Sequence, residues 1–189
     1  MSLKDEEKWN HKYEVPEYMA GKEPVEWLKD HSGLLKREGS ALDIASGEGR
    51  NAVFAAENGY QTLAVDISTK GLEKARALAD EKGVSIETQL VDLDNWKIEQ
   101  NAFDLILCFN FLDRRIFPAI QRALKPGGLI FYETFTIDYL KYSSFKREWV
   151  LEHNELLHAF SELRILNYRE VDTSYKAFAS LIALKQNDL

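Results

Sequence analysis

The sequence is poor in three features that would place a protein in a specialised class. It has one cysteine among 189 residues, so no disulfide can form within the chain and a reducing compartment is expected. It has no apolar run near the ~20 residues that cross a bilayer. Its first ten residues, MSLKDEEKWN, lack the apolar centre of a signal peptide. These absences predict a cytoplasmic protein with no membrane partner.

Positive charge is also scarce, because 31 acidic residues outnumber 24 lysines and arginines and the formal net charge is −7. Nucleic-acid binding depends on Lys and Arg that neutralise phosphates. Two short basic stretches, residues 35–39 and 141–148, are interpreted as solvated surface, although aromatic residues interleave the second. We therefore expect no nucleic-acid partner.

Repeats, low-complexity segments and linkers rich in Gly, Ser or Pro are missing as well, and 189 residues fit a single domain. From Ser40 onward, short apolar runs alternate with helical patterns, which is typical of an α/β fold with a parallel sheet covered by helices. Helices are expected at about 50–58, from 68 or 69 to 82, and along Ile116, Ile120 and Leu124. Strands are expected at 41–45, 61–67, 84–91, 103–109 and 129–134.

The two ends of the sequence differ from this alternation. Residues 163–170 and 175–184 are strand-like but are joined by too few residues for a crossover helix, so they are expected to be antiparallel. Residues 1–39 are interpreted as an N-terminal helical flap in which Pro24 opens a helix at its first position. The predicted organisation is one domain, 1–189, made of this flap and a core at 40–189.

The stretch LDIASGEGRNA, residues 42–52, places a glycine-rich turn between a predicted strand and a predicted helix. Such a turn lets the backbone approach a ligand closely and points the amino end of the helix at it. Asp43 and Glu48 add two carboxylates, which would repel a pyrophosphate. The turn therefore favours a ligand with positive charge near the glycines, and S-adenosylmethionine has such charge in its sulfonium and ammonium groups.

Two more acids follow the next two predicted strands. Asp66 lies about 20 residues after the first glycine of the turn, a spacing at which a carboxylate can bind ribose hydroxyls. Asp92 follows the third strand, where it could meet an adenine amino group while Leu93 packs on the ring. Ligands of open α/β sheets bind at the carboxyl ends of the strands, so these acids predict one adenosine site. Arg50, in the first helical turn, either reaches solvent or meets a carboxylate of the methionine moiety or of a substrate.

The segments LDIASGEGRNAVFAAENG, VDIS, VDLDNW, FDLILCFNFLDR and LKPGGLIFYET together resemble class I S-adenosylmethionine-dependent methyltransferases over about residues 40–134. GRNA and KWNHKY are similar to the small-molecule enzymes of the tellurite-resistance and thiopurine kind. The resemblance implies a Rossmann-like, seven-stranded, mostly parallel sheet with helices on both faces and a C-terminal antiparallel strand pair. It implies S-adenosylmethionine as cofactor. The implied binding residues are Asp43, Ala45, Ser46, Gly47, Gly49 and Arg50 at the methionine end, Asp66 and Ile67 at the ribose, Asp92 and Leu93 at the adenine, and Phe109 and Asn110 beside the sulfonium.

The sequence identifies neither a catalytic base nor a metal site. Its four histidines are scattered, and Cys108 is interpreted as a buried residue of the fourth strand. The acceptor pocket is expected between the flap and the loops after the fourth and fifth strands, although the same aromatics would serve equally well to attach the flap, and Tyr132 could face a helix instead. Its candidate walls are Trp9, Tyr13, Tyr132 and Glu133, with Tyr18, Phe135 and Tyr142.

The leading hypothesis is therefore a methyltransferase that acts on a small-molecule acceptor by in-line displacement. The missing base leaves open a non-catalytic module that binds the cofactor or a partner. An NAD-dependent oxidoreductase using G-x-G-x-x-A is disfavoured by Asp43, by Glu48 and by the antiparallel end of the chain. The accepting atom (S, Se, O or N) and the oligomeric state stay open.

Overall fold

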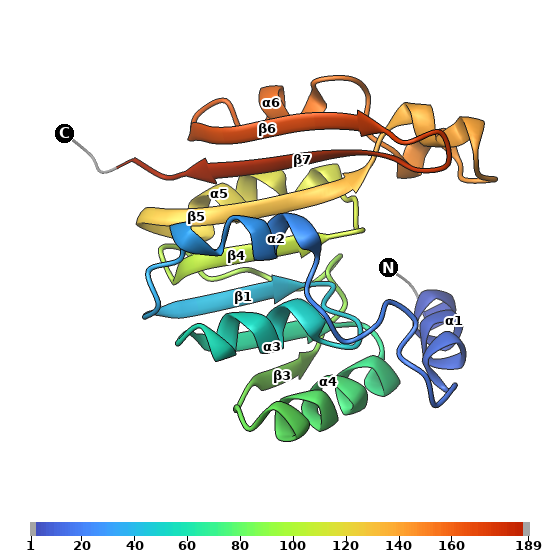
Figure 1. Cartoon of the computed structure of the whole chain (residues 1–189), viewed down its shortest axis with the longest axis vertical. Helices are drawn as coiled ribbons and strands as arrows, with labels where there is room; N and C mark the ends of the chain where they lie inside the picture. Colours follow the sequence, from blue (N-terminus) through green and yellow to red (C-terminus); the bar gives the residue numbers. More distant parts are fainter. Residues whose placement is uncertain (1–2, 187–189) are drawn as a thin grey trace. The chain divides into compact units, whose positions relative to one another are not determined.

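The computed structural model describes residues 3–186. The chain divides into two compact units, Met1–Ile98 and Glu99–Leu189. The strands form a seven-stranded sheet in the order β3-β2-β1-β4-β5-β7-β6, with the first three strands of that order in the first unit. This mostly parallel sheet, surrounded by helices, confirms the predicted fold class (Figure 1). The expected single domain with a flap at 1–39 stays a prediction.

The first unit contains three parallel strands, β1 (Ser40–Ile44), β2 (Gln61–Asp66) and β3 (Glu87–Leu90). Helices α3 (Arg50–Glu57) and α4 (Thr69–Lys82) pack against them. The ends of α4 follow the sequence signals: the Ser68 hydroxyl accepts a hydrogen bond from the Gly71 amide, and Gly83 closes the helix with a φ of 70°. β3 is shorter than the predicted strand at 84–91.

The N-terminal part of this unit contains α1 (Leu3–Tyr13), α2 (Glu26–Asp30) and a 3-10 helix, η1 (Ser32–Leu34). Pro24 was expected at the first position of a helix, and this was wrong. Val25 is the N-cap of α2, with an extended backbone (ψ 133°), so Pro24 lies just outside the helix. This agrees with the other common position of proline, in extended chain before a helix begins.

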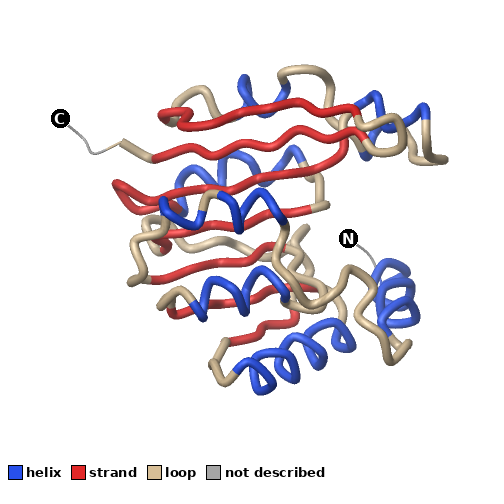
Figure 2. Tube along the Cα trace, viewed as in Figure 1, coloured by secondary structure: helices blue, strands red, loops and turns tan. Residues whose placement is uncertain are grey.

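The second unit contains β4 (Phe103–Phe109), β5 (Leu124–Phe135), β6 (Arg164–Asp172) and β7 (Ala177–Leu184). β4 and β5 are parallel, whereas β7 lies between β5 and β6 and is antiparallel to both. The predicted antiparallel end of the chain is thus confirmed, and Figure 2 shows β6 and β7 following one another directly. The helical elements of this unit are η2 (Arg114–Ile116), α5 (Phe117–Ala123), η3 (Ile137–Lys141), η4 (Arg147–Trp149) and α6 (Glu155–Ala159).

Leu124 was expected on the helix before the KPGG turn, but it is the first residue of β5. Its backbone is extended, with φ −64° and ψ 133°, so α5 ends at Ala123. Pro126 explains the early end, because a proline disfavours helical backbone at the residue before it, here Lys125.

Candidate cofactor site

The turn between β1 and α3 needs left-handed backbone at three of its five residues. Ala45, Gly47 and Gly49 have φ values of 53°, 54° and 80°. At Gly49 a Cβ would also lie 2.4 Å from the Ala75 Cβ of α4. Only glycine therefore lets α3 begin this close to α4. The result is the tight strand–turn–helix connection that the sequence predicts.

Asp43 and Asp66 are buried beneath this turn, with residue exposures of 1% and 6%. Asp66 Oδ2 accepts a hydrogen bond from the Gly47 amide and Oδ1 accepts one from the Ser68 amide, each at 2.8 Å. The Asp43 carboxylate accepts one from the Ala52 amide, whereas its Oδ2 has no partner among the described residues. A buried oxygen without a partner is costly, and a cationic ligand would supply what it lacks.

The protonation of these two carboxyls reflects the same burial. Loss of solvent raises the pKa of Asp43 to about 8, with Asp66 adding to the effect and the Ala52 amide opposing it. Burial also raises the pKa of Asp66, against the hydrogen bonds from its neighbouring amides. These residues fit a ligand whose positive charge would favour the ionised carboxyls.

The end of β3 lies next to the end of β2 in the same unit. The Val91 amide donates to the Asp66 carbonyl at 2.9 Å, so Asp92 and Leu93 follow directly after this contact. Asp92 closes a local turn by accepting from the Asp94 amide at 3.0 Å and from the Asn95 side chain at 2.9 Å. Leu93 is buried, as is Ile67 after β2. Asp66 and Asp92 therefore lie at the carboxyl ends of adjacent strands, as the sequence predicts.

Helix α1 covers the turn. A Cβ on Gly47 would lie 2.7 Å from the Tyr13 hydroxyl, and the Trp9 ring stacks on Tyr13 with centroids 5.6 Å apart. Asn10 attaches α1 to the start of α4, because its Oδ1 accepts from the Ser68 hydroxyl at 2.8 Å and from the Lys70 amide at 3.1 Å. Burial raises the pKa of the Tyr13 phenol, and Asp66 and Glu48 add to this, so Tyr13 stays a hydrogen-bond donor at the turn. Tyr13, predicted as an acceptor wall, thus lies on the predicted cofactor turn.

Glu48 attaches the chain that follows α1, residues 14–25, which we call the strap. Its Oε2 accepts a hydrogen bond from the Met19 amide at 2.8 Å, and its Oε1 forms an ion pair with Lys74 Nζ at 2.7 Å. Lys74 also donates to the Glu17 carbonyl at 2.7 Å. The prediction that Glu48 presents a negative charge to the ligand is wrong: its charge is paired with Lys74, and it binds the strap.

The two residues at the start of α3 hold the strap as well. Arg50 Nη1 donates to the Ala20 carbonyl at 2.6 Å, and Asn51 Oδ1 accepts from the Val25 amide at 2.9 Å. Asn51 is itself buried, so this hydrogen bond is shielded from solvent. Arg50 thus binds the strap, and its charge also lowers the pKa of Asp43 against the effect of burial. Its predicted role at the methionine end stays a prediction.

These contacts of the strap and of α1 could not be predicted from the sequence, because they join residues that lie far apart in the chain. Glu48 and Lys74 are 26 positions apart, and Asn10 and Ser68 are 58 apart. The one local signal was the position of Lys74, directly before Ala75 in the apolar stripe of α4, where a half-buried lysine needs a carboxylate partner.

In the second unit, Phe109 ends β4 and is buried, and Asn110 follows in left-handed backbone with φ 56°. The Asn110 amide donates to the Glu133 carbonyl of β5 at 2.8 Å. Glu133 is buried, and its Oε2 accepts from the Ser180 hydroxyl of β7 at 2.6 Å. The roles predicted for Phe109, Asn110 and Glu133 stay predictions.

Tyr132 is not available to an acceptor within this unit. It is completely buried, and its ring centroid lies 5.7 Å from Phe117 and 5.9 Å from Phe160. Its hydroxyl donates to the Phe111 carbonyl at 2.9 Å. Tyr132 therefore faces the helix layer, the alternative that the sequence had left open, and it is removed from the candidate pocket walls.

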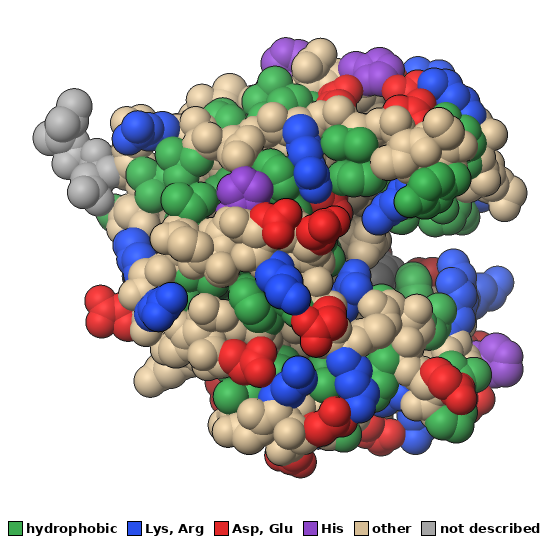
Figure 3. All heavy atoms as spheres, in the orientation of Figure 1, with side chains coloured by type: hydrophobic (Ala, Val, Ile, Leu, Met, Phe, Trp, Pro, Cys, Tyr) green, Lys and Arg blue, Asp and Glu red, His purple; other side chains and the backbone are tan. Residues whose placement is uncertain are grey.

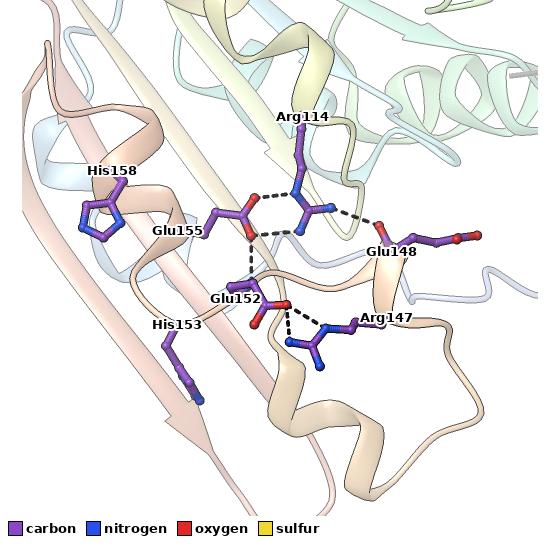
Figure 4. A pocket seen from close by; sticks show the side chains of 7 residues that line it. All are labelled: Arg114, Arg147, Glu148, Glu152, His153, Glu155 and His158. Carbon is purple, nitrogen blue, oxygen red and sulfur yellow. Dashed lines mark hydrogen bonds and ion pairs between the residues drawn. The ribbon is translucent and has the colours of Figure 1, made fainter.

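A solvent-open pocket of about 640 Å³ lies in the second unit and contains none of the predicted cofactor residues (Figure 4). Arg114 binds both carboxylate oxygens of Glu155, at 2.5 and 2.8 Å, and also the carbonyls of Glu148 and Val150. Because Arg114 is already bound to protein groups, it fixes residues 148–155 in place. The lining residues are Arg114, Arg147, Glu148, Glu152, His153, Glu155 and His158.

The described surface adds three observations. On the face shown in Figure 3, basic and acidic side chains are interspersed. Among residues 3–186, the structure has no helix with the length and apolar character that a membrane span requires. Within the same part of the chain, His, Cys, Asp and Glu side chains do not gather in threes as metal ligands do. The expected cytoplasmic location and the expected lack of a metal stay predictions.

Comparison with known proteins tests the resemblance directly. Residues 41–128 match the family model of a methyltransferase domain. The resemblance to class I methyltransferases is confirmed. The matched residues include the turn and the ends of β1 to β4, so the methyltransferase match covers the predicted cofactor residues in both units.

Curated proteins similar to this chain include the ubiquinone biosynthesis O-methyltransferase of Idiomarina loihiensis, 35% identical over 115 residues, which are 57% of this chain and 46% of the relative. The tRNA 5-carboxymethoxyuridine methyltransferase of Escherichia coli is 31% identical over 97 residues, which are 47% of this chain and 37% of that protein. The chain spans about half the length of the first curated relatives, or less.

Solved methyltransferase structures share the fold. TehB from Haemophilus influenzae matches with a TM-score of 0.71 at 20% identity, over 96% of this chain and 67% of TehB. An S-adenosylmethionine-dependent methyltransferase from Mesorhizobium loti matches with a TM-score of 0.67 at 20% identity, over 86% of this chain and 98% of that one. At these identities the likeness concerns the fold alone.

Proposed function

We propose that the protein is an S-adenosylmethionine-dependent methyltransferase that acts on a small-molecule acceptor. The observation that supports this most is the buried Asp43–Asp66 pair beneath a glycine turn, inside the segment that matches a methyltransferase domain. Asp43 Oδ2 has no partner among the described residues, and a cation is the ligand that would satisfy it. The domain match also disfavours the alternative of an NAD-dependent oxidoreductase.

The cofactor would be held at its methionine end by the turn and at its adenosine end by the acids after β2 and β3. It supplies a methyl group activated by the positive sulfur. The protein supplies the rest by binding and orientation, which can contribute ~7–11 kcal/mol when the reacting atoms are held in line. The proposed binding residues are Asp43, Ala45, Ser46, Gly47, Gly49, Arg50, Asp66, Ile67, Asp92, Leu93, Phe109 and Asn110.

The proposed acceptor atom is oxygen. The first curated relatives are O-methyltransferases, 27–35% identical to this chain over 115–124 residues. A hydroxyl acceptor profits from a protein group that takes up its proton, unlike a thiol.

Calorimetry with S-adenosylhomocysteine and S-adenosylmethionine tests the proposal. We expect micromolar binding, and we expect Asp66→Asn to weaken it about tenfold or more, because the variant carries one oxygen fewer and no charge. Asp30→Ala, an exposed acid at the end of α2, is the matched control and should bind as the wild type does. Failure of both compounds to bind at high micromolar concentration would refute the proposal, whereas binding without transfer to any acceptor would favour the non-catalytic module.

A second candidate acceptor is tRNA, because a tRNA methyltransferase of Escherichia coli is among the relatives. The net charge alone therefore does not support excluding nucleic acid. On the face shown in Figure 3 the basic and acidic side chains are interspersed, which does not favour tRNA binding at that face. Transfer of a labelled methyl group to total tRNA, compared with transfer to a panel of phenols, distinguishes the two.

A further inference from the structure

Glu133 is a buried carboxylate near the carboxyl end of β5 and is not one of the proposed cofactor-binding residues. Its side chain is 6% exposed, Oε2 accepts from Ser180 Oγ at 2.6 Å, and Oε2 lies 3.7 Å from Arg169 Nη2. Both contacts use Oε2, and Oε1 has no hydrogen-bond partner among the described residues. Oε1 is not among the fully buried atoms that lack a hydrogen-bond partner, so it is open to solvent on an otherwise buried side chain. A ligand hydroxyl could therefore donate a hydrogen bond to it.

Glu133 also lies next to the end of β4. Phe109 and Glu133 are register partners in the parallel pair of β4 and β5. Register partners of neighbouring strands project to the same face of a sheet. The proposed function has Phe109 and Asn110 beside the sulfonium, so Glu133 would lie within the part of the second unit that meets the reacting atoms.

A cluster of four aromatic rings begins at Phe135, two residues after Glu133 on β5. Phe135 projects to the same face two residues further on, and its ring stacks on Tyr139 with centroids 4.3 Å apart and an interplanar angle of 16°. Phe145 packs edge-on against both rings, and Trp149 packs edge-on against Phe145. Phe145 and Trp149 are 40% and 45% exposed. Partly exposed rings that continue from the strand face of Glu133 suit a flat acceptor that carries a hydroxyl group.

We propose that Glu133 binds the hydroxyl of an aromatic acceptor and removes its proton during methyl transfer. The inference rests on the proposed function. The acceptor proton passes to Glu133 as the acceptor oxygen bonds to the methyl carbon. The carbon–sulfur bond breaks with its electron pair staying on sulfur, and the proton then leaves Glu133 for water. The Ser180 hydrogen bond orients the carboxylate, so Ser180 is a positioning residue.

Two acceptors that differ in their need for a base test this role. With the full chain and S-adenosylmethionine, 3,4-dihydroxybenzoate offers a hydroxyl, whereas 4-mercaptobenzoate offers an arenethiol that is largely ionised near neutral pH. Glu133→Gln should lower kcat/KM about 100-fold for the hydroxyl acceptor and less than about threefold for the thiol. Ser180→Ala is a milder change that serves if Glu133→Gln does not fold. It should lower kcat/KM about tenfold for the hydroxyl acceptor and leave kcat/KM for the thiol unchanged. Glu162→Gln, at an exposed position before β6, is the matched control.

A spectroscopic titration tests the same contact without turnover. The colour of 4-nitrocatechol reports its ionisation, and a neighbouring carboxylate disfavours the phenolate. With S-adenosylhomocysteine present, the bound ligand should therefore ionise about one pH unit lower on Glu133→Gln than on the wild type.

The outcomes separate the two proposals. The role of Glu133 would be overturned by equal losses of kcat/KM for the hydroxyl and thiol acceptors, or by a titration of bound 4-nitrocatechol that Glu133→Gln leaves unchanged. It would also be overturned if the protein bound S-adenosylhomocysteine but not 4-nitrocatechol. A wild type that binds neither form of the cofactor would instead overturn the proposed function.

Discussion

The Glu48–Lys74 ion pair gives the most quantitative prediction. The two side chains are 5% and 16% exposed, and their charged atoms are 2.7 Å apart. Lys74→Met leaves the Glu48 carboxylate buried without its counter-charge, and removing one partner of a buried pair costs ~3–5 kcal/mol. Because Lys74 keeps some contact with solvent, we expect a loss of about 3 kcal/mol in the free energy of unfolding, near the lower end. For a chain of this length that lowers Tm by about 6–12 °C.

Thermal and urea unfolding of three variants measure the effect. Glu48→Gln keeps an acceptor for the Met19 amide and should cost less, about 1–2 kcal/mol. The double variant should be more stable than the sum of the single losses implies, because it leaves no uncompensated carboxylate. Lys70→Met is the matched control on the same helix, since Lys70 pairs with Glu73 at 2.9 Å but both side chains are 47% exposed. Equal Tm values for Lys74→Met and Lys70→Met would refute the argument that burial of the pair matters.

Three further predictions concern stability. Gly49→Ala combines a φ of 80° with a Cβ 2.4 Å from the Ala75 Cβ, so urea unfolding should show a loss of about 3 kcal/mol, and a loss below about 1 kcal/mol would contradict the packing argument. The pKa of Asp43 is about 8 in the folded protein and 3.8 ordinarily, so the folded state keeps a proton that the unfolded chain has lost. The free energy of unfolding should therefore fall as pH rises between these values. In urea titrations Asp43→Asn should make this slope shallower, leaving the part that the raised pKa of Asp66 contributes. Arg114→Met removes a bidentate ion pair with Glu155 that is partly exposed, so the free energy of unfolding should fall by about 1 kcal/mol. Limited proteolysis should then cut residues 148–155 faster, because Arg114 also binds the Val150 carbonyl. An unchanged digestion pattern would argue against that attachment.

The sequence predicts the local features of the cofactor site well. The glycines of the turn, the Ser68 cap and the Gly83 end of α4 each depend on backbone preferences of a few neighbouring residues, and the structure has all of them as expected. The antiparallel pairing of β6 and β7 follows from the short connection between them, which leaves no room for a crossover.

The sequence fails where a side chain has a choice of face or a distant partner. Residues 128–134 of β5 are all buried, so the strand shows no alternation of buried and exposed positions there. Such a strand, covered on both faces, does not reveal from its pattern which way Tyr132 and Glu133 point. The structure separates them: Tyr132 packs on Phe117 and Phe160, and Glu133 bonds Ser180. Side-chain contacts across strands, and not the apolar run itself, decide the orientation.

The charged residues at the turn form two groups that differ in what they bind. Asp43 and Asp66 bind backbone amides beneath the turn, and Asp43 keeps an oxygen without a partner among the described residues, which fits a cationic ligand. Glu48 and Arg50 bind the strap instead. Because the strap follows directly on Tyr13, which lies on Gly47, loosening the strap should disturb α1 without removing any ligand-binding group. Changes at Glu48 should therefore act on cofactor affinity through the position of α1, whereas changes at Asp43 should act on it through charge.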